Sequence, residues 1–335
     1  MNILITSVGG PLVKPLTKFL KKDKQLNISN IIGIDQKKKI PKNNYLYKFY
    51  QVKKKKTFNY LKQIKIICEK EKIKLIIPYS DNEAKIFAKY KKIFINKKIK
   101  ILVNNLNILN KINNKYLTYT VLKKAKIRVP RFKLIRNTSD LKKNIIHFNY
   151  PSNGIVIKPT KGVGGRGVIL LPKKNEKYNK FSLGKREKII KNLKINKNIK
   201  TLFKHGDLLM MDLLRPPAYD VDSCRIKNKT HVVIRKRINP SGIPYKGNIV
   251  IKNTIIENYC KNIMKKLKIN SLIDIDLLTD SKKRPILLEI NPRPSGSLVT
   301  SYMAGIPILS LEIANILKIK YKFNSKNRLL KKIKF

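Results

Sequence analysis

Short apolar runs alternate with longer amphipathic stretches through the first hundred residues of the chain. The runs have the length and pattern of buried strands, and they cover residues 2–7, 31–35, 74–78 and 99–103. The stretches between them have helical periodicity, and they cover residues 12–22, 58–70 and 82–93. Strands that alternate with helices are typical of a parallel sheet. We therefore expect an α/β domain with a Rossmann-like parallel sheet in residues 1–104.

The remainder of the chain has a different order of elements. A mostly helical stretch at 105–125 ends before Val129 and Pro130, and residues 154–171 form a strand, a glycine-rich loop and a second strand. Further strands are expected at 208–214, 219–226, 231–237, 272–279 and 285–291. Successive strands without intervening helices favour antiparallel pairing, so residues 105–320 should form a second domain of α+β type. Residues 321–335 form a basic tail.

Composition sets limits on the class of protein. The chain of 335 residues is long enough for about two domains, and no apolar stretch approaches the roughly 20 residues that cross a bilayer. The start of the chain is a strand and a glycine turn, without a basic leader, so we expect a cytoplasmic protein and no membrane partner. Cys68, Cys224 and Cys260 are far apart, which is consistent with reduced structural thiols.

The formal net charge of +58 changes the picture less than its size indicates. Such a charge attracts polyanions, with a strong dependence on salt. Only 12 of the 77 basic residues are arginine, however, and lysine is spread through every segment, as expected from an AT-rich genome. We favour this compositional origin over dedicated nucleic-acid binding, which stays an alternative. Positions that keep Gly, Arg, Asp or Glu against this bias are the better candidates for function.

Four glycines between positions 162 and 167 form the first such candidate. Gly162, Gly164, Gly165 and Gly167 follow Lys158, which lies on the strand that enters the loop. Closely spaced glycines let backbone N–H groups approach a phosphate, and a lysine adds a point charge. The loop leads back into a strand, so it is not a Walker P-loop. It predicts a hairpin that closes over a triphosphate, although any tight hairpin can also be glycine-rich.

Acidic residues on two later strands form the second candidate. Asp276 and Glu289 lie 13 residues apart, on strands joined by a turn, so antiparallel pairing would bring their carboxylates together. A divalent cation offsets their repulsion, and Asn291 adds an oxygen on the same face as Glu289. Arg293 can hold a phosphate. The alternative is an ordinary salt bridge to one of many lysines.

Several other residues have weaker signals. Arg235 and Arg237 share one face of a strand, which suggests recognition of a carboxylate or phosphate, or pairing with surface acids. The turn at Gly9 and Gly10 lacks the dinucleotide-binding fingerprint, although Asp35 lies at a suitable distance along the chain. The aromatic residues between 45 and 50 could stack bases, but they are more typical of a loop anchor. We interpret His147, His205 and His231 as structural or surface residues.

Taken in order, these motifs resemble the ATP-grasp superfamily. Residues 1–104 resemble the pre-ATP-grasp domain of carbamoyl-phosphate-synthase-like members, through the segments 3–10, 32–35 and 76–83. The segment 113–130 resembles the helix that carries a first phosphate-binding lysine, and the glycine loop, the strand 210–214 and the strands around Asp276 and Glu289 follow in the family's order. The resemblance implies an ATP-grasp fold after the N-terminal domain, with a lid at about 150–212.

The resemblance also implies roles for individual residues. Lys115 and Lys158 would hold the ATP phosphates under the loop 162–167, and Asp276, Glu289 and Asn291 would hold Mg²⁺, with Mn²⁺ as an alternative. The adenine and phosphates would contact Lys115, Lys158, Gly162, Gly164, Gly165, Gly167, Met211, Asp212 and Leu213. One departure is Pro216, Pro217 and Ala218 where the family usually has an acidic ribose ligand. Either Asp212 or Asp220 replaces this ligand, or the affinity for the nucleotide is weakened.

The function implied is that of a Mg-ATP-dependent ligase. A carboxylate substrate would be activated as an acyl phosphate and captured by an amine or similar nucleophile, with Arg293, Arg235 and Arg237 as the catalytic candidates. The alternatives are a carbamoyl-phosphate-synthase-like kinase and a protein that binds polyanions or nucleic acid. The partners would be a small carboxylate and an amine, with a homodimer left open.

Overall fold

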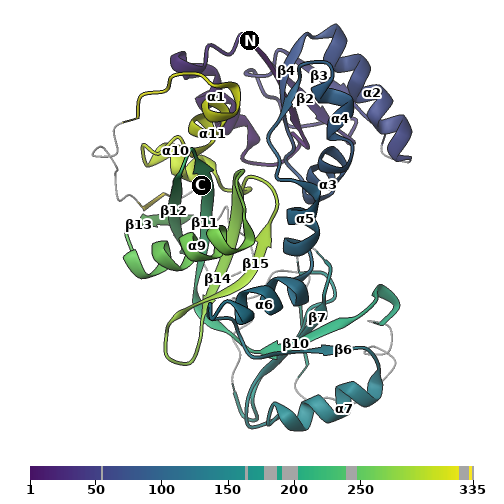
Figure 1. Cartoon of the computed structure of the whole chain (residues 1–335), viewed down its shortest axis with the longest axis vertical. Coiled ribbons are helices and arrows are strands. Elements are labelled where there is room, and N and C mark those ends of the chain that lie inside the picture. The colour runs from purple at the N-terminus through teal and green to yellow at the C-terminus, as the bar shows by residue number, and fades with distance from the viewer. Residues whose placement is uncertain are drawn as a thin grey trace.

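Three β-sheets lie along the long axis of the molecule, and the last one in the sequence lies between the other two (Figure 1). The computed structural model describes residues 1–53, 56–162, 165–176, 187–190, 203–238, 247–323 and 332–333. The predicted α/β and α+β classes are confirmed, because the first sheet is parallel and the last is antiparallel. None of the helices in these ranges is long and apolar enough to cross a membrane.

The first sheet is built from the predicted N-terminal strands. Its order is β3 (Lys48–Gln51), β2 (Asn30–Asp35), β1 (Asn2–Thr6), β4 (Ile73–Ile77) and β5 (Lys100–Ile101), all parallel. The helices that accompany it are α1 (Val13–Lys22), α2 (Thr57–Lys70), α3 (Asp81–Lys89) and α4 (Lys91–Ile95). The predicted single helix at 82–93 is divided at Tyr90, and β3 was not expected. The aromatic residues around Tyr50 therefore belong to an edge strand.

A pair of helices leads into a second, smaller sheet. These helices are α5 (Leu106–Ile112) and α6 (Lys115–Lys124), and Asn114 caps the second by accepting a hydrogen bond from the Leu117 amide at 3.2 Å. The sheet has the order β6 (Phe132–Ile135), β10 (Leu208–Asp212), β7 (Ile155–Pro159), β8 (Ile169–Leu171) and β9 (Lys188–Ile189). Helix α7 (Thr138–His147) and the short helix η3 (Phe203–His205) accompany it. The predicted hairpin around the glycine loop is the β7–β8 pair.

The third sheet holds the predicted carboxylates. Its order is β15 (Pro285–Asn291), β14 (Ile273–Thr279), β11 (Arg215–Ile226), β12 (Lys229–Arg237), β13 (Asn248–Ile251) and β16 (Lys332–Ile333). Helix α9 (Thr254–Leu267) packs on one face, where Ile263 and Met264 meet Ile275 in one hydrophobic core. The other face meets α10 (Val299–Met303) and α11 (Ile308–Leu317).

The last helices return to the first domain. Leu298, Leu309 and Ile313 share a core with Ile3 of β1 and Leu16 of α1, and the short helix η1 (Lys24–Leu26) contacts α11. In Figure 1 the yellow helices α10 and α11 accordingly lie beside the purple N-terminal elements. The third sheet is therefore packed against the N-terminal domain on one face and against helix α9 on the other. This packing holds the polar residues of β11, β12, β14 and β15 in place.

Candidate functional site

A pocket lies between the second and third sheets. Nine of the predicted site residues line it, and they are Lys115, Lys158, Gly162, Gly165, Met211, Leu213, Arg237, Asp276 and Glu289. Of the remaining candidates, Gly167, Asp212, Asn291, Arg293 and Arg235 lie outside this lining, and Gly164 falls outside the described residues. Its lining combines apolar side chains, such as Val156, Leu170 and Leu278, with charged ones.

Two buried lysines, Lys115 and Lys158, line the pocket. Lys158 on β7 is 3% exposed and its Nζ donates to the Leu288 carbonyl at 3.4 Å, while Lys115 at the start of α6 is 8% exposed. Lys115 Nζ contacts the Gly162 carbonyl at 2.9 Å and Glu289 Oε2 at 3.1 Å. Burial, together with the charge of Lys115, lowers the pKa of Lys158 to about 7. Two buried ammonium groups side by side are an arrangement that an anion stabilises.

The predicted carboxylates are direct neighbours across β14 and β15. Asp276 pairs with Glu289 and Asp274 with Asn291 in the strand register, so the antiparallel pairing inferred from the sequence is confirmed. Asn291 Nδ2 donates to Asp274 Oδ2 and Asp276 Oδ2, each at 3.2 Å. Burial raises the pKa of Asp276, and the charge of Asp274 raises it further. Burial opposes ionisation of Glu289 too, but Lys115 and Lys158 hold its pKa below the usual value.

The structure adds two acids to the predicted set. Asp220, Asp274 and Asp276 offer carboxylate oxygens that all lie within 4.8 Å of one another. Arg237 contacts Asp220 and, at 3.0 Å, Asp276 Oδ1, and it lowers the pKa of Asp220 to about 2 against the effect of burial. Asp274 could have been found from the sequence, since it lies two residues before Asp276 on the same strand face. Asp276 and Glu289 line the pocket together with Glu187, which lies beside the glycine loop, so a cation bound between β14 and β15 would meet Asp276 and Glu289.

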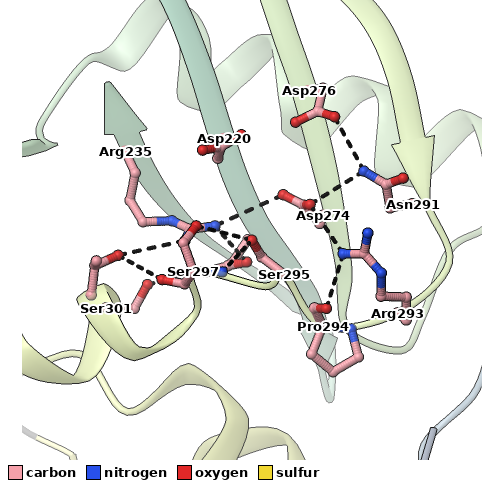
Figure 2. A network of polar contacts seen from close by, with 12 residues as sticks. Asp220, Arg235, Asp274, Asp276, Asn291, Arg293, Pro294, Ser295, Ser297 and Ser301 are labelled. Atoms are coloured by element: carbon pink, nitrogen blue, oxygen red, sulfur yellow. Dashed lines mark hydrogen bonds and ion pairs between the residues drawn. The ribbon is translucent and has the colours of Figure 1, made fainter. Parts of the chain in front are cut away.

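Arg235 is not part of the pocket lining. Its side chain is completely buried, and its guanidinium contacts Asp222 Oδ1 at 2.9 Å. It also contacts Ser297 Oγ at 2.5 Å (Figure 2). Ser301 donates to the second oxygen of Asp222 at 3.0 Å. The predicted contact of Arg235 with substrate does not agree with this burial, because Ser297 and Asp222 already occupy its fork. Arg235 joins β12 to the segment that precedes α10.

Arg293 connects the third sheet to the N-terminal domain. Its Nη1 approaches Asp274 Oδ2 at 3.4 Å, and its Nε lies 3.1 Å from Asp81 Oδ1 at the start of α3. Figure 2 shows the guanidinium beside Asp274. A second link runs from the Tyr79 hydroxyl to the Ser295 carbonyl at 2.7 Å. Asp81 and Tyr79 were not among the candidates from the sequence, since nothing in their segment shows which part of the chain they meet.

The glycine loop owes its course to backbone conformation. Gly165 and Gly167 both have φ of 73°, a left-handed conformation that favours glycine. A Cβ at Gly165 would lie 3.1 Å from the Glu187 side chain. The loop therefore passes close to the Glu187 side chain. That it closes over a triphosphate stays a prediction.

Residues expected to bind adenine and ribose, at the end of β10 and on β11, already have partners within the protein. The Leu213 amide already donates to the Gly154 carbonyl at 3.0 Å, so it would have to leave this partner to bind adenine. Asp212 pairs with Arg131 at 2.9 Å, and Asp220 with Arg237. Both acids suggested as ribose ligands are thus engaged with arginines.

Comparisons with known proteins agree with this architecture. A RimK-like ATP-grasp domain profile matches residues 112–200, and a profile described as "ATP-grasp in the biosynthetic pathway with Ter operon" matches residues 204–331. The chain therefore belongs to the ATP-grasp superfamily. Residues 3–102 match the PylC-like N-terminal domain, so the chain is an ATP-grasp protein with a domain of that type in front. No curated protein sequence gives a significant match.

Solved structures share the fold over nearly the whole chain. An L-amino acid ligase from Bacillus licheniformis has a TM-score of 0.66 at 14% identity, covering 95% of this chain and 74% of that one. N5-carboxyaminoimidazole ribonucleotide synthetase from Thermotoga maritima has a TM-score of 0.65 at 18% identity, with 99% and 79% covered. The biotin carboxylase domain of the Hydrogenobacter thermophilus 2-oxoglutarate carboxylase, determined with MgADP and bicarbonate, has 0.70 at 14%, with 98% and 72% covered. At these identities the likeness concerns the fold.

Proposed function

We propose that the protein is a Mg-ATP-dependent carboxylate–amine ligase. The observation that carries the proposal is the pocket that joins Lys115 and Lys158 to the facing carboxylates Asp276 and Glu289. Lysines and acids in a pocket that also has apolar side chains suit a nucleotide whose phosphates are bridged by a divalent cation. The names of the structural relatives, which are ligases and a carboxylase, support the same class.

The side chains present fit a magnesium ion. Three acids lie close together, and the Asp220 Oδ2 and Asp274 Oδ1 atoms are buried without a hydrogen-bond partner among the described residues. Such carboxylates repel, and a hard cation with oxygen ligands offsets this cost. We propose Asp276, Glu289 and Asn291 as the residues that hold Mg²⁺, or Mn²⁺ in its place. When bound, the ion would neutralise charge on the phosphates.

The chain's own residues then have defined roles. Lys158 and Lys115 would hold the phosphates, and Gly162, Gly164, Gly165 and Gly167 would let the loop cover them. A substrate carboxylate oxygen attacks the γ-phosphorus while its bond to the bridging oxygen breaks and ADP leaves. An amine then attacks the acyl carbon, phosphate departs with the electron pair of the C–O bond, and the amine loses a proton. Arg293 and Arg237, which flank the carboxylates, would stabilise the negative charge.

The wider organisation remains part of the proposal. We divide the chain into residues 1–104, 105–320 and 321–335, with a lid at about 150–212. We propose Met211, Asp212 and Leu213 as the adenine side of the site, with the Leu213 amide changing partner on binding. A cytoplasmic enzyme is consistent with Cys68, Cys224 and Cys260, which are all free and buried. A homodimer stays a prediction.

One assay tests the function. Purified protein with MgATP is screened against amino acids, hydroxy acids and sugar acids, and ADP release is measured with and without hydroxylamine, which traps an acyl phosphate as a hydroxamate. We expect one acid to give ADP and, with hydroxylamine, a hydroxamate. Turnover with bicarbonate alone would favour the carbamoyl-phosphate-synthase-like kinase. ATP binding without ADP release from any acid would contradict the ligase proposal.

A further inference from the structure

A second pocket lies at the seam between the N-terminal domain and helix α11, apart from the residues of the nucleotide site. It has a volume of about 270 Å³. Helix α4 and strand β5 contribute Lys91 and Lys100, and the end of β11 contributes Arg225. No residue of this lining also lines the first pocket.

A buried carboxylate forms the floor of this second pocket. Glu312 is 2% exposed and lies in α11, whose sequence ILSLEIANIL is otherwise almost entirely apolar. The Ser271 hydroxyl, the Leu272 amide and the Cys224 thiol lie close enough to hydrogen-bond to this carboxylate. Its Oε2 atom nevertheless has no well-formed hydrogen bond among the described residues, and Ser271 lines the same pocket. Burial raises the pKa of Glu312 to about 7. A buried acceptor without a partner is costly, so Glu312 needs a reason to be in this helix.

Three cations, Lys91, Lys100 and Arg225, line the same pocket as Glu312. Burial lowers the pKa of Lys91, and the charge of Lys100 lowers it further, so the two ammonium groups affect one another. Arg225 has no ion-pair partner in the part of the chain that the structure describes, in a protein that has only 12 arginines. A guanidinium beside two ammonium groups can bind an oxyanion through its planar fork.

The pocket lies between two parts of the chain that are held together by Asn104. Asn104 lies beside it and binds across the seam, since its Oδ1 accepts from the Asn270 and Ser271 amides at 2.9 Å each and its Nδ2 donates to the Ser271 carbonyl at 3.2 Å. A molecule in the pocket would contact Lys91 and Lys100 on the N-terminal side and Arg225 and Glu312 on the other. It would thus join both domains.

We propose that this second pocket binds a small carboxylate or phosphate ester that also carries a hydroxyl or ammonium group. The oxyanion contacts Arg225, Lys91 and Lys100, and the donor group forms a hydrogen bond to Glu312 Oε2. The site is separate from the catalytic pocket and its occupancy does not depend on turnover, so the inference stands or falls independently of the proposed ligase activity.

Calorimetric titration of the full chain, saturated with MgADP, tests the inference. The probes are D-glycerate, L-serine and glycerol 3-phosphate, each compared with acetate or inorganic phosphate, which lack the second group. We expect saturable binding of at least one of the three probes, about tenfold or more tighter than its comparison anion, because two charge-assisted hydrogen bonds are gained.

Variants locate the binding. Arg225→Gln and Glu312→Gln should each weaken it about tenfold or more, while Lys229→Gln, a nearby exposed lysine with the same loss of charge, and Lys158→Ala, in the first pocket, should leave it unchanged. If Glu312→Gln does not fold, Arg225→Gln at its half-exposed position still decides. The proposal is overturned if no probe saturates, if Lys229→Gln weakens binding as much as Arg225→Gln, or if Lys158→Ala alone abolishes it.

Discussion

At the scale of single residues, the balance of charge around Asp276 determines both activity and stability. Asp276 shares Arg237 with Asp220, and its own charge is opposed by Asp274 and by burial. Removing one negative charge from this group relieves repulsion but takes a ligand from the proposed cation. Neutralising one of these acids should therefore lower the activity and have little effect on the stability of the fold.

Asp276→Asn should lower the rate of ADP release by about a hundredfold or more, since loss of a cation ligand removes several kcal/mol of charge stabilisation. Its midpoint of thermal unfolding should stay within a few degrees of the wild type. Asp280→Asn is the matched control, because Asp280 lies in the exposed turn beside Arg284. Near-normal turnover in Asp276→Asn would contradict the metal assignment.

Lys158 predicts a pH dependence of nucleotide binding. With a pKa of about 7, it is largely neutral at pH 8 in the free protein, and a bound phosphate would raise this pKa. Binding at pH 8 should therefore take up a proton, and affinity should fall as the pH rises through about 7, whereas at pH 6 the lysine is already charged. Titration of a non-hydrolysable ATP analogue in two buffers of different ionisation enthalpy counts the protons.

Two substitutions separate a placed lysine from general positive charge. Lys158→Ala should weaken analogue binding by about tenfold or more, as expected for a lost charged hydrogen bond. Lys161→Ala removes the same charge from an exposed position in the loop and should have little effect. Equal losses would mean that the field of the whole protein, and not Lys158, holds the nucleotide.

At the scale of elements, β12 carries two arginines whose side chains differ in burial. Arg235 is completely buried against Asp222 and Ser297, while the Arg237 side chain is 13% exposed and lines the pocket. The two residues have the same spacing that the sequence shows, but α10 and its preceding segment cover only one of them. Their effects on stability and catalysis should differ accordingly.

Arg235→Leu should lower the free energy of unfolding by about 3–5 kcal/mol, because it leaves Asp222 buried without its partner. Arg237→Lys keeps the charge, loses the fork to Asp220 and Asp276, and should lower kcat/KM with a smaller change in stability. Urea unfolding and steady-state kinetics on the same two variants give both values. The reverse pattern would show that Arg235, and not Arg237, acts on the substrate.

The sequence predicted the elements that have a clear period and missed those that depend on distant contacts. The β14–β15 pair was predictable because alternation, a turn and two acids agree with one register. Helix α9 could also have been found, since Asn253 caps it and Ile256, Tyr259, Cys260 and Ile263 recur at helical spacing. Helix α11 is apolar on most faces, so its pattern alone does not separate a buried helix from a strand.

The candidate site was predicted in part for the same physical reason. Lys158 and the glycine loop are close in sequence, so local spacing was sufficient to place them together. Two contacts join segments far apart in the chain: the ion pair of Arg293 with Asp81 and the hydrogen bond of Arg235 with Ser297. Only tertiary packing brings such residues together, and no local pattern encodes it.

At the scale of the whole molecule, the charge of +58 should govern encounters with polyanions but not the chemistry of the pocket. We expect a random DNA duplex to bind at low salt and to lose affinity by about a hundredfold or more between 50 and 200 mM salt, with little preference for sequence. Fluorescence anisotropy with two unrelated duplexes measures this. A sequence preference that persists at high salt would instead support dedicated nucleic-acid binding.

The return of α10 and α11 to the first domain has a consequence for synthesis on the ribosome. Ile3 and Leu16 complete their core with Leu309 and Ile313, which are translated roughly 15 to 60 seconds later at about 5–20 residues per second. The apolar face of the nascent first domain thus stays uncovered while most of the protein is made. We expect this face to be the part of the chain that chaperones protect during translation.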